Sequence, residues 1–250
     1  MSLPFLIYFS LPLLALFLRT SPSHLADNLS SPQVLQAVVL SLVTTLVTTL
    51  VTILLGTPLA YALAHHSFPL PRVIDTLIDI PTVLPPAVAG VALLMTFGRR
   101  GLLGGALDAA GIHIPFTTAA VVMAQTFVAA PFYIKAATIA FTDIDAELEQ
   151  AASLDGADGW QAFRYVILPL AWVALLSGSV MTWARALGEF GATIIFAGNF
   201  PGRTQTMPLA IYLGFELDLD TALTLSVILV GTSFLVLMLV KGILHREVEV

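Results

Sequence analysis

The 250-residue sequence contains no cysteine and few charged residues. Without cysteine the chain can form neither a disulfide framework, nor a thiolate metal site, nor a cysteine nucleophile. Charged residues make up 10% of the chain, against about 25% in ordinary soluble domains, and the net charge of −6 provides no basic surface for nucleic acid. With 58% hydrophobic residues, both a soluble domain and a disordered chain are excluded. The remaining class is a polytopic, helical membrane protein.

Six apolar segments are candidate membrane spans, so the sequence predicts an all-α membrane protein with about six transmembrane helices. The segments are residues 3–18, 34–64, 81–97, 117–141, 168–187 and 223–244. The first is short and is interpreted as a peripheral anchor. In the third, Pro81, Pro85 and Pro86 lack N–H donors and predict an irregular start or a kink, and Pro131 allows a break in the fourth. No repeat or low-complexity linker divides the chain, so residues 1–250 are expected to form a single domain.

The second apolar segment carries hydroxyl side chains on one face. At about 100° per residue they fall within a sector of about 140°. The members are Ser41, Thr44, Thr45, Thr48, Thr49 and Thr52. Hydroxyls can bind an oxyanion without trapping it as a fixed positive charge would, so Ser41, Thr44, Thr48 and Thr52 are candidates for lining an anion route. Serine and threonine are also common at helix–helix contacts in membranes, and packing alone is the stronger alternative.

Arg185 and Glu189 lie four residues apart near the end of the fifth segment, on one helix face where they can pair. Ionisable groups in a span usually face a bundle interior or a water-filled cavity. We expect a structural or gating ion pair; the alternative is that Arg185 attracts an anion while Glu189 limits its hold. Lys135 is expected to extend to the membrane interface. His65 and His66 point apart on a helix without a third ligand, which favours a solvated pair over a metal site.

The sequence contains no catalytic motif. There is no Gly-x-Ser-x-Gly and no His-Glu-x-x-His, and neither lysine follows a glycine as a phosphate-binding loop requires. We therefore expect no enzymatic activity, no nucleotide hydrolysis by this chain, and no metal or cofactor.

An acidic segment separates the fourth and fifth spans. Residues 142–167 hold six acidic residues against one base, Arg164. Residues 143–154 are expected to form a short amphipathic helix that ends at Gly156, which can adopt a left-handed cap conformation. Pro169 is expected near the start of the next helix, where its missing N–H has little effect.

This segment resembles the EAA loop of ABC-importer permeases, which reads Glu-Ala-Ala, three residues, Gly, nine residues, Ile, one residue, Leu-Pro. Aligned on Gly156, the alanine pair and the Leu-Pro match, while Gln150 occupies the Glu position and Glu149 stands one place earlier. In the family this loop is the cytoplasmic coupling helix, which docks into the ATP-binding subunit. The resemblance implies that residues 142–167 are cytoplasmic and residues 188–220 external. The implied coupling residues are Glu149, Gln150, Ala151, Ala152, Gly156, Ala157, Leu168 and Pro169.

Other stretches look like the molybdate branch of these permeases, and the resemblance extends over roughly residues 34–244. The stretches are residues 56–61, 85–90, 184–193, 196–199 and 201–212. The resemblance implies a type I importer (MetI-like) fold in the cell inner membrane that translocates molybdate. It also implies three partners: a second copy of the chain, an ATP-binding subunit and a soluble oxyanion-binding protein. Tungstate and sulfate permeases remain alternatives; an ion-coupled transporter or channel would more often show inverted repeats.

Overall fold

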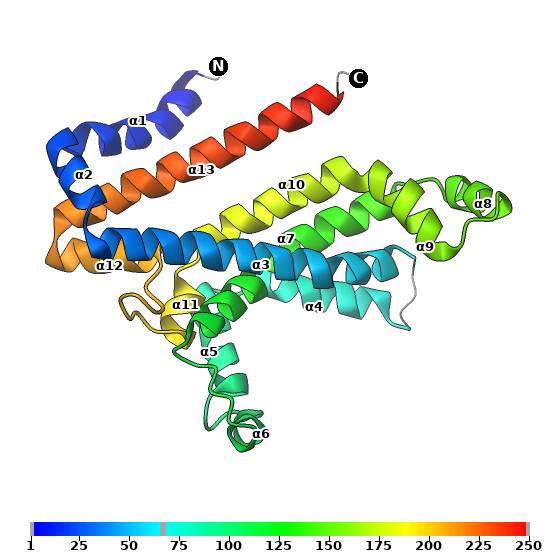
Figure 1. The fold of residues 1–250 in the computed structure, drawn as a ribbon, viewed down its shortest axis with the longest axis horizontal. Helices are drawn as coiled ribbons and strands as arrows, with labels where there is room; N and C mark the ends of the chain where they lie inside the picture. The colour runs from blue at the N-terminus through cyan, green and yellow to red at the C-terminus, as the bar shows by residue number, and fades with distance from the viewer. Residues whose placement is uncertain (1–2, 66–68, 249–250) are drawn as a thin grey trace.

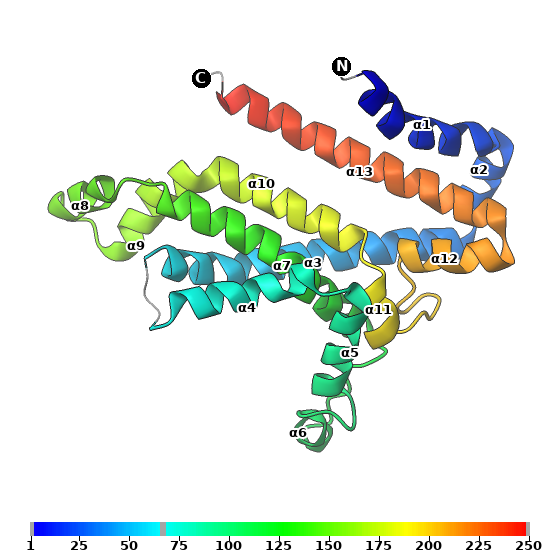
Figure 2. The same ribbon diagram turned by 180° about the vertical axis from the view of Figure 1, so that it is seen from behind.

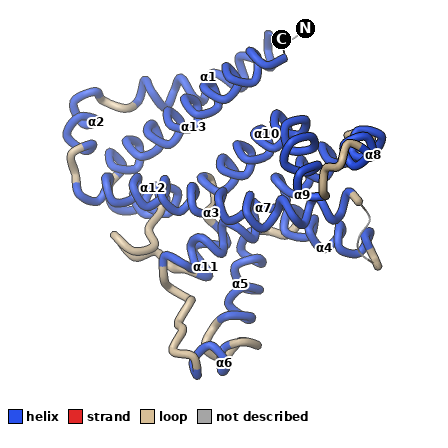
Figure 3. The backbone as a smooth tube through the Cα atoms, turned by 45° about the vertical axis from the view of Figure 1, so that its right-hand side comes forward, coloured by secondary structure: helices blue, strands red, loops and turns tan. Residues whose placement is uncertain are grey.

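The computed structural model describes residues 3–65 and 69–248, apart from the side chains of residues 22–24, 26 and 243–248. Every regular element in these ranges is a helix (Figures 1 and 3). The elements are α1 (Leu3–Arg19), α2 (Pro22–Leu29), α3 (Pro32–Ala64), α4 (Pro71–Val83), α5 (Pro86–Phe97), α6 (Gly104–Ala109), α7 (Thr118–Thr142), α8 (Ala146–Leu154), α9 (Gly159–Ala162), the π-helix η1 (Phe163–Ile167), α10 (Leu168–Leu187), α11 (Gly191–Phe196), α12 (Met207–Leu217) and α13 (Leu219–Val248).

Each of the six predicted segments contains a helix, which confirms the all-α membrane fold. Among the described residues, four helical segments are long and apolar enough to cross a membrane, and the bent pair α4–α5 makes a possible fifth. The four are α3, α7, the continuous segment Gly159–Leu187, and α13. The predicted first span is α1, which with 17 residues is shorter than the roughly 20 that a span needs.

The third predicted span is broken at the prolines, as expected. α4 ends at Val83, Leu84 is extended with a ψ of 137°, and α5 leaves at an angle of 117° to α4. A residue that precedes a proline is driven from the helical region, and Pro85 and Pro86 cannot donate backbone hydrogen bonds. α4 therefore follows the bundle, whereas α5 turns away and carries α6 outward (Figures 1 and 2). Pro131, in contrast, lies inside an uninterrupted α7 that packs against α3 and α10.

The centre of the fold is a bundle in which α7 packs against both α3 and α10. One buried apolar cluster joins these helices and includes Ala60, Ile134, Phe141, Ile167 and Leu175. The approach of α10 to α7 is close, because a Cβ at Gly178 would lie only 2.8 Å from Ala136 Cβ. Small residues of this kind allow helices to pack in membranes, where the hydrophobic effect does not bring them together. A second apolar cluster packs α5 against α11 and the first half of α7.

The bundle has two distinct ends. α8 and α9 lie at one end, with the last turns of α3 and α7, whereas α11 and α12 lie toward the other (Figures 1 and 2). The N-terminal end of α1 and the C-terminal end of α13 both point toward the α8 end (Figure 1). The segment predicted to be cytoplasmic therefore lies on the side toward which both chain ends point, and residues 188–217 lie toward the opposite side.

The acidic segment contains more helix than expected. α8 begins after Asp145, whose carboxylate accepts a hydrogen bond from Glu147 N–H, and it ends before Gly156, which has the predicted left-handed conformation with a φ of +91°. A second start follows at Asp158, where a capping box with Gln161 opens α9. From there the helix continues through η1 into α10. Residues 159–167, expected to belong to the loop, are therefore helical.

The π-helix η1 immediately precedes Pro169. Leu168 N–H donates to the carbonyl of Phe163, five residues earlier, instead of four as in an α-helix. Proline removes one backbone donor and crowds the carbonyl four residues before it, so a wider turn here lets the helix continue. Pro169 occupies the first turn of α10, as predicted, but α10 is the continuation of an existing helix.

Candidate functional site

The exposed end of the bundle is formed by residues 145–165, which we call the α8–α9 surface. It leaves large apolar side chains exposed: Leu154 is 89% exposed, Trp160 69% and Tyr165 72%. Acidic residues surround them, including the exposed Asp145, Glu147 and Asp155. Exposed apolar side chains with a polar rim indicate a protein contact surface.

The structure brings most of the predicted coupling residues together on this surface. Gln150, Ala151 and Gly156 are exposed, and Ala152 and Ala157 are half-buried beside them. Ala157 N–H donates to the carbonyl of Ala152 at 3.0 Å, which closes the end of α8. Leu168 and Pro169 do not lie on the α8–α9 surface. They belong to α10, where Leu168 packs against the central apolar cluster.

Glu149 also departs from the predicted arrangement, because its carboxylate reaches the bundle. Oε1 accepts a hydrogen bond from the Tyr61 hydroxyl at 3.0 Å, and Oε2 lies 3.2 Å from His65 Nε2. Its neighbour Gln150 is exposed. Glu149 therefore connects α8 to the end of α3, and His65, expected to be solvated, has a carboxylate partner. His66 lies outside the described residues.

Tyr61 is the centre of an aromatic cluster at this end of the bundle. Its ring lies 4.1 Å from that of His65, 5.7 Å from that of Phe141 and 5.2 Å from that of Phe163, measured between centroids. The contacts with Phe141 and Phe163 are edge-to-face, a favourable geometry for aromatic pairs. The cluster thus joins the end of α3 to α7 and η1. The sequence offered one signal for it, since Tyr61 and His65 are four residues apart on a helix.

The predicted ion pair between Arg185 and Glu189 is present at the other end of α10. Arg185 Nη1 lies 2.9 Å from Glu189 Oε2, while Glu189 Oε1 accepts a hydrogen bond from Ala192 N–H at 2.8 Å. The Glu189 side chain is 1% exposed and that of Arg185 30% exposed. Glu189 therefore links the end of α10 to α11, and its charge is buried beside a cation that still reaches the surface.

The hydroxyl face of α3 is buried within the chain. Ser41 Oγ accepts a hydrogen bond from Met207 N–H at 2.7 Å, and Thr48 Oγ1 donates to Gln125 Oε1 at 3.1 Å. Thr44 donates to the carbonyl of Ser41, and Thr52 Oγ1 has no hydrogen-bond partner among the residues that the structure describes. In this conformation the face makes contacts from α3 to α7 and α12, which agrees with the packing alternative. Gln125, 1% exposed inside the bundle, was missed by the sequence analysis.

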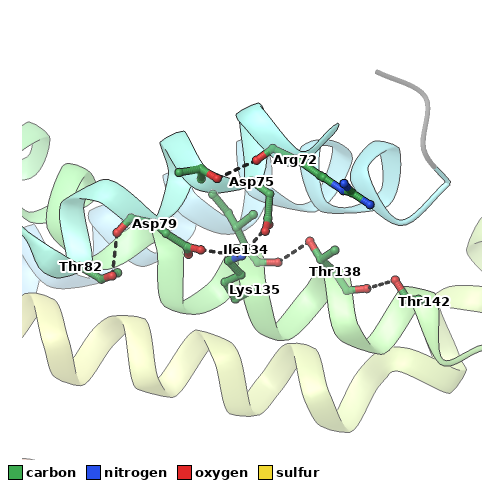
Figure 4. Close-up of polar contacts among 9 residues, drawn as sticks. Arg72, Asp75, Asp79, Thr82, Ile134, Lys135, Thr138 and Thr142 are labelled. Atoms are coloured by element: carbon green, nitrogen blue, oxygen red, sulfur yellow. Dashed lines mark hydrogen bonds and ion pairs between the residues drawn. The ribbon is translucent and has the colours of Figure 1, made fainter. Parts of the chain in front are cut away.

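Lys135, which the sequence predicts to extend to the membrane interface, forms an ion cluster with α4. Its ammonium group lies between two carboxylates of α4, 2.5 Å from Asp75 Oδ1 and 2.9 Å from Asp79 Oδ2 (Figure 4). The two aspartates are four residues apart and therefore share a face of α4. This ion cluster, which joins α4 to α7, was also missed by the sequence analysis.

Comparison with known proteins gives a consistent result. Residues 53–250 match the family model described as "Binding-protein-dependent transport system inner membrane component". The molybdenum transport system permease protein ModB of Mycobacterium tuberculosis (strain ATCC 25618 / H37Rv) is 42% identical over 233 residues, which cover 93% of this chain and 88% of that protein. The sulfate transport system permease protein CysW of Synechococcus elongatus is 34% identical over 225 residues, covering 90% of this chain and 79% of that protein.

Solved structures show the same fold at low identity. A bacterial ABC transporter involved in the import of the acidic polysaccharide alginate matches with a TM-score of 0.77 at 15% identity, covering 98% of this chain and 92% of that chain. An inward-facing MetNI methionine ABC transporter matches with a TM-score of 0.66 at 20% identity, covering 86% of this chain and 95% of that chain. The predicted fold of an ABC-importer permease is thereby confirmed.

Proposed function

The chain belongs to the family of binding-protein-dependent transport system inner membrane components, and from this membership we propose that it is the membrane-spanning subunit of an ATP-driven molybdate importer. The assignment of molybdate as the substrate rests on the 42% identity to ModB proteins over 93% of the chain. The sulfate permease CysW is less similar, at 34% identity, and makes sulfate the second candidate.

Import of such a dianion requires an energy source. At a membrane potential of about 100 mV, negative inside, moving two negative charges inward costs roughly 4.6 kcal/mol. Each tenfold accumulation of the dianion adds about 1.4 kcal/mol. Because the sequence has no phosphate-binding motif, we assign ATP hydrolysis to a separate subunit. A second copy of this chain would complete the pathway, and a soluble oxyanion-binding protein would deliver the substrate from outside.

The α8–α9 surface is our candidate for the contact with the ATP-binding subunit. It lies at one end of the bundle, on the side toward which both chain ends point, and it exposes apolar side chains within an acidic rim. Gln150, Ala151, Ala152, Gly156 and Ala157 would form the contact. Leu168 and Pro169 would support it indirectly, because they belong to the helix that continues from this surface into the bundle. The acidic rim favours a cleft with basic side chains on the partner.

Arg185 and Glu189 are our candidates for a gate, because a buried carboxylate paired with a half-exposed cation can be rearranged when helices move. Ser41, Thr44, Thr48 and Thr52 would line the route only in a conformation in which α3 separates from α7 and α12. In the conformation described, their contacts support packing.

The proposal is tested by reconstitution into vesicles with the ATP-binding subunit and the binding protein. We expect ATP-dependent uptake of labelled molybdate. Unlabelled molybdate should inhibit this uptake more strongly than sulfate or tungstate does. Uptake that proceeds without ATP would refute the importer assignment, and preferential competition by sulfate would establish the second candidate.

A further inference from the structure

We propose that Glu149 is a positioning residue that couples α8 to α3, so that movement of the α8–α9 surface is transmitted to the bundle through Tyr61 and His65. The inference rests on the proposed function of this surface as the docking site of an ATP-binding subunit. It goes further by naming the side chains that transmit the movement.

Both oxygens of the Glu149 carboxylate contact the end of α3. Oε1 accepts from the Tyr61 hydroxyl and Oε2 pairs with His65 Nε2, and these two partners are one turn apart at the C-terminal end of α3, where His65 is the capping residue. A carboxylate held at two points has a defined orientation, unlike a surface side chain held at one. Glu149 therefore fixes both the distance and the rotation of α8 relative to the end of α3.

Within the described part of the chain, the polar side-chain contacts that join α8 to another helix are those of Glu149. The other polar side-chain contacts of α8 are local: Asp145 accepts from Glu147 N–H, and Ser153 donates to the carbonyl of Glu149. A cavity of about 170 Å³ separates α8 from the ends of α3 and α7, lined in part by His65, Phe141 and Glu149. α8 also packs against α9 and η1, but across this gap it is the carboxylate of Glu149 that joins α8 to the end of α3.

The receiving end of the contact is firmly held. The Tyr61 ring packs against Phe141 and Phe163, which belong to α7 and η1. α3 continues from there into the bundle and packs against both α7 and α10. A force applied to α8 therefore reaches α3 through Glu149, in addition to the route through α9 and η1 into α10. The exposed Gln150 beside it is left to contact the partner.

The test measures the position of α8 directly. The chain has no cysteine, so cysteines introduced at the exposed Leu154 of α8 and Leu55 of α3 can be spin-labelled without background. Labelled chains diluted into unlabelled ones report the distance within one chain by pulsed electron paramagnetic resonance. Leu170→Cys with Leu55→Cys serves as the control pair, because Leu170 lies on α10 and not on α8.

We expect Glu149→Ala to broaden the 55–154 distance distribution at least twofold and to leave the 55–170 distribution unchanged. Glu149→Gln retains an acceptor for Tyr61 and should restore most of the order, and Tyr61→Phe added to Glu149→Ala should cause no further change. Glu147→Ala is the matched control, since it removes an exposed carboxylate from the same helix. Equal distributions for Glu149→Ala and Glu147→Ala would overturn the inference.

A second readout connects position to transport. In the reconstituted importer, Glu149→Ala should lower the molybdate transported per ATP hydrolysed at least threefold, with ATP hydrolysis retained, and Glu149→Gln should recover part of the ratio. An unchanged ratio would refute the role in transmission. The distance measurement needs no transport. If the wild-type protein imported no molybdate while Glu149→Ala still broadened the α8 distances, the proposed function would be refuted and the structural link would be retained.

Discussion

Replacement of Arg185 by methionine tests the ion pair at the end of α10. The change keeps an unbranched side chain and removes the cation that lies 2.9 Å from Glu189 Oε2. Glu189 is 1% exposed, so its carboxylate is buried when it loses the guanidinium. Loss of one partner of a buried pair costs about 3–5 kcal/mol. The lower end applies here, because Glu189 Oε1 keeps its hydrogen bond from Ala192 N–H.

A loss of about 3 kcal/mol lowers the unfolding midpoint by about 6–12 °C in a chain of this length. Thermal unfolding in detergent can be followed by the fluorescence of the three tryptophans. The double variant Arg185→Met/Glu189→Gln removes the unpaired charge and should recover at least half of the loss. A midpoint within 2 °C of the wild type for Arg185→Met would show that the pair does not stabilise the fold. If this variant also took up molybdate normally, the pair would no longer be a candidate for the gate.

Three further changes test other parts of the structure. Gly156→Val places a β-branched residue at a φ of +91°, at a cost of about 1–3 kcal/mol, and should abolish binding of the ATP-binding subunit in co-purification; retained binding and uptake would contradict the docking assignment. Lys135→Met leaves two aspartates of α4 without their cation and should increase proteolysis within α4, whereas an unchanged digestion pattern would show that the ion cluster does not hold α4. Thr48→Val should slow uptake while assembly stays intact, and unchanged uptake would assign the hydroxyl face of α3 to packing alone.

Features that depend on neighbouring residues could be predicted from the sequence. The break before α5 follows from Pro85 and Pro86, whose effect on the preceding residue is local. The left-handed Gly156 follows from its place after a short helix, and the ion pair of Arg185 with Glu189 follows from four-residue spacing. Each of these needs only the geometry of one helix or turn.

Features that depend on the relative placement of helices could not be predicted in this way. Lys135 and Asp75 are 60 residues apart, and nothing in either segment specifies that α4 lies against α7. The division of roles between Glu149 and Gln150 is a similar case. Adjacent side chains on a helix point about 100° apart, so which of the two faces the bundle depends on how α8 is docked. The EAA pattern locates the segment but not the direction of its carboxylate.

The wide turn of η1 has a geometric consequence for the whole molecule. A π-turn holds one residue more than an α-turn, and one residue corresponds to a rotation of about 100° about the helix axis. Because the helix runs without interruption from Gly159 into α10, this turn takes up the extra residue and spares α9 the rotation of about 100° that the same insertion would cause in a regular helix. A single-residue deletion within Phe163–Ile167 would make this turn an ordinary one and bring Pro169 against the carbonyl four residues before it, without rotating the α8–α9 surface about the helix axis.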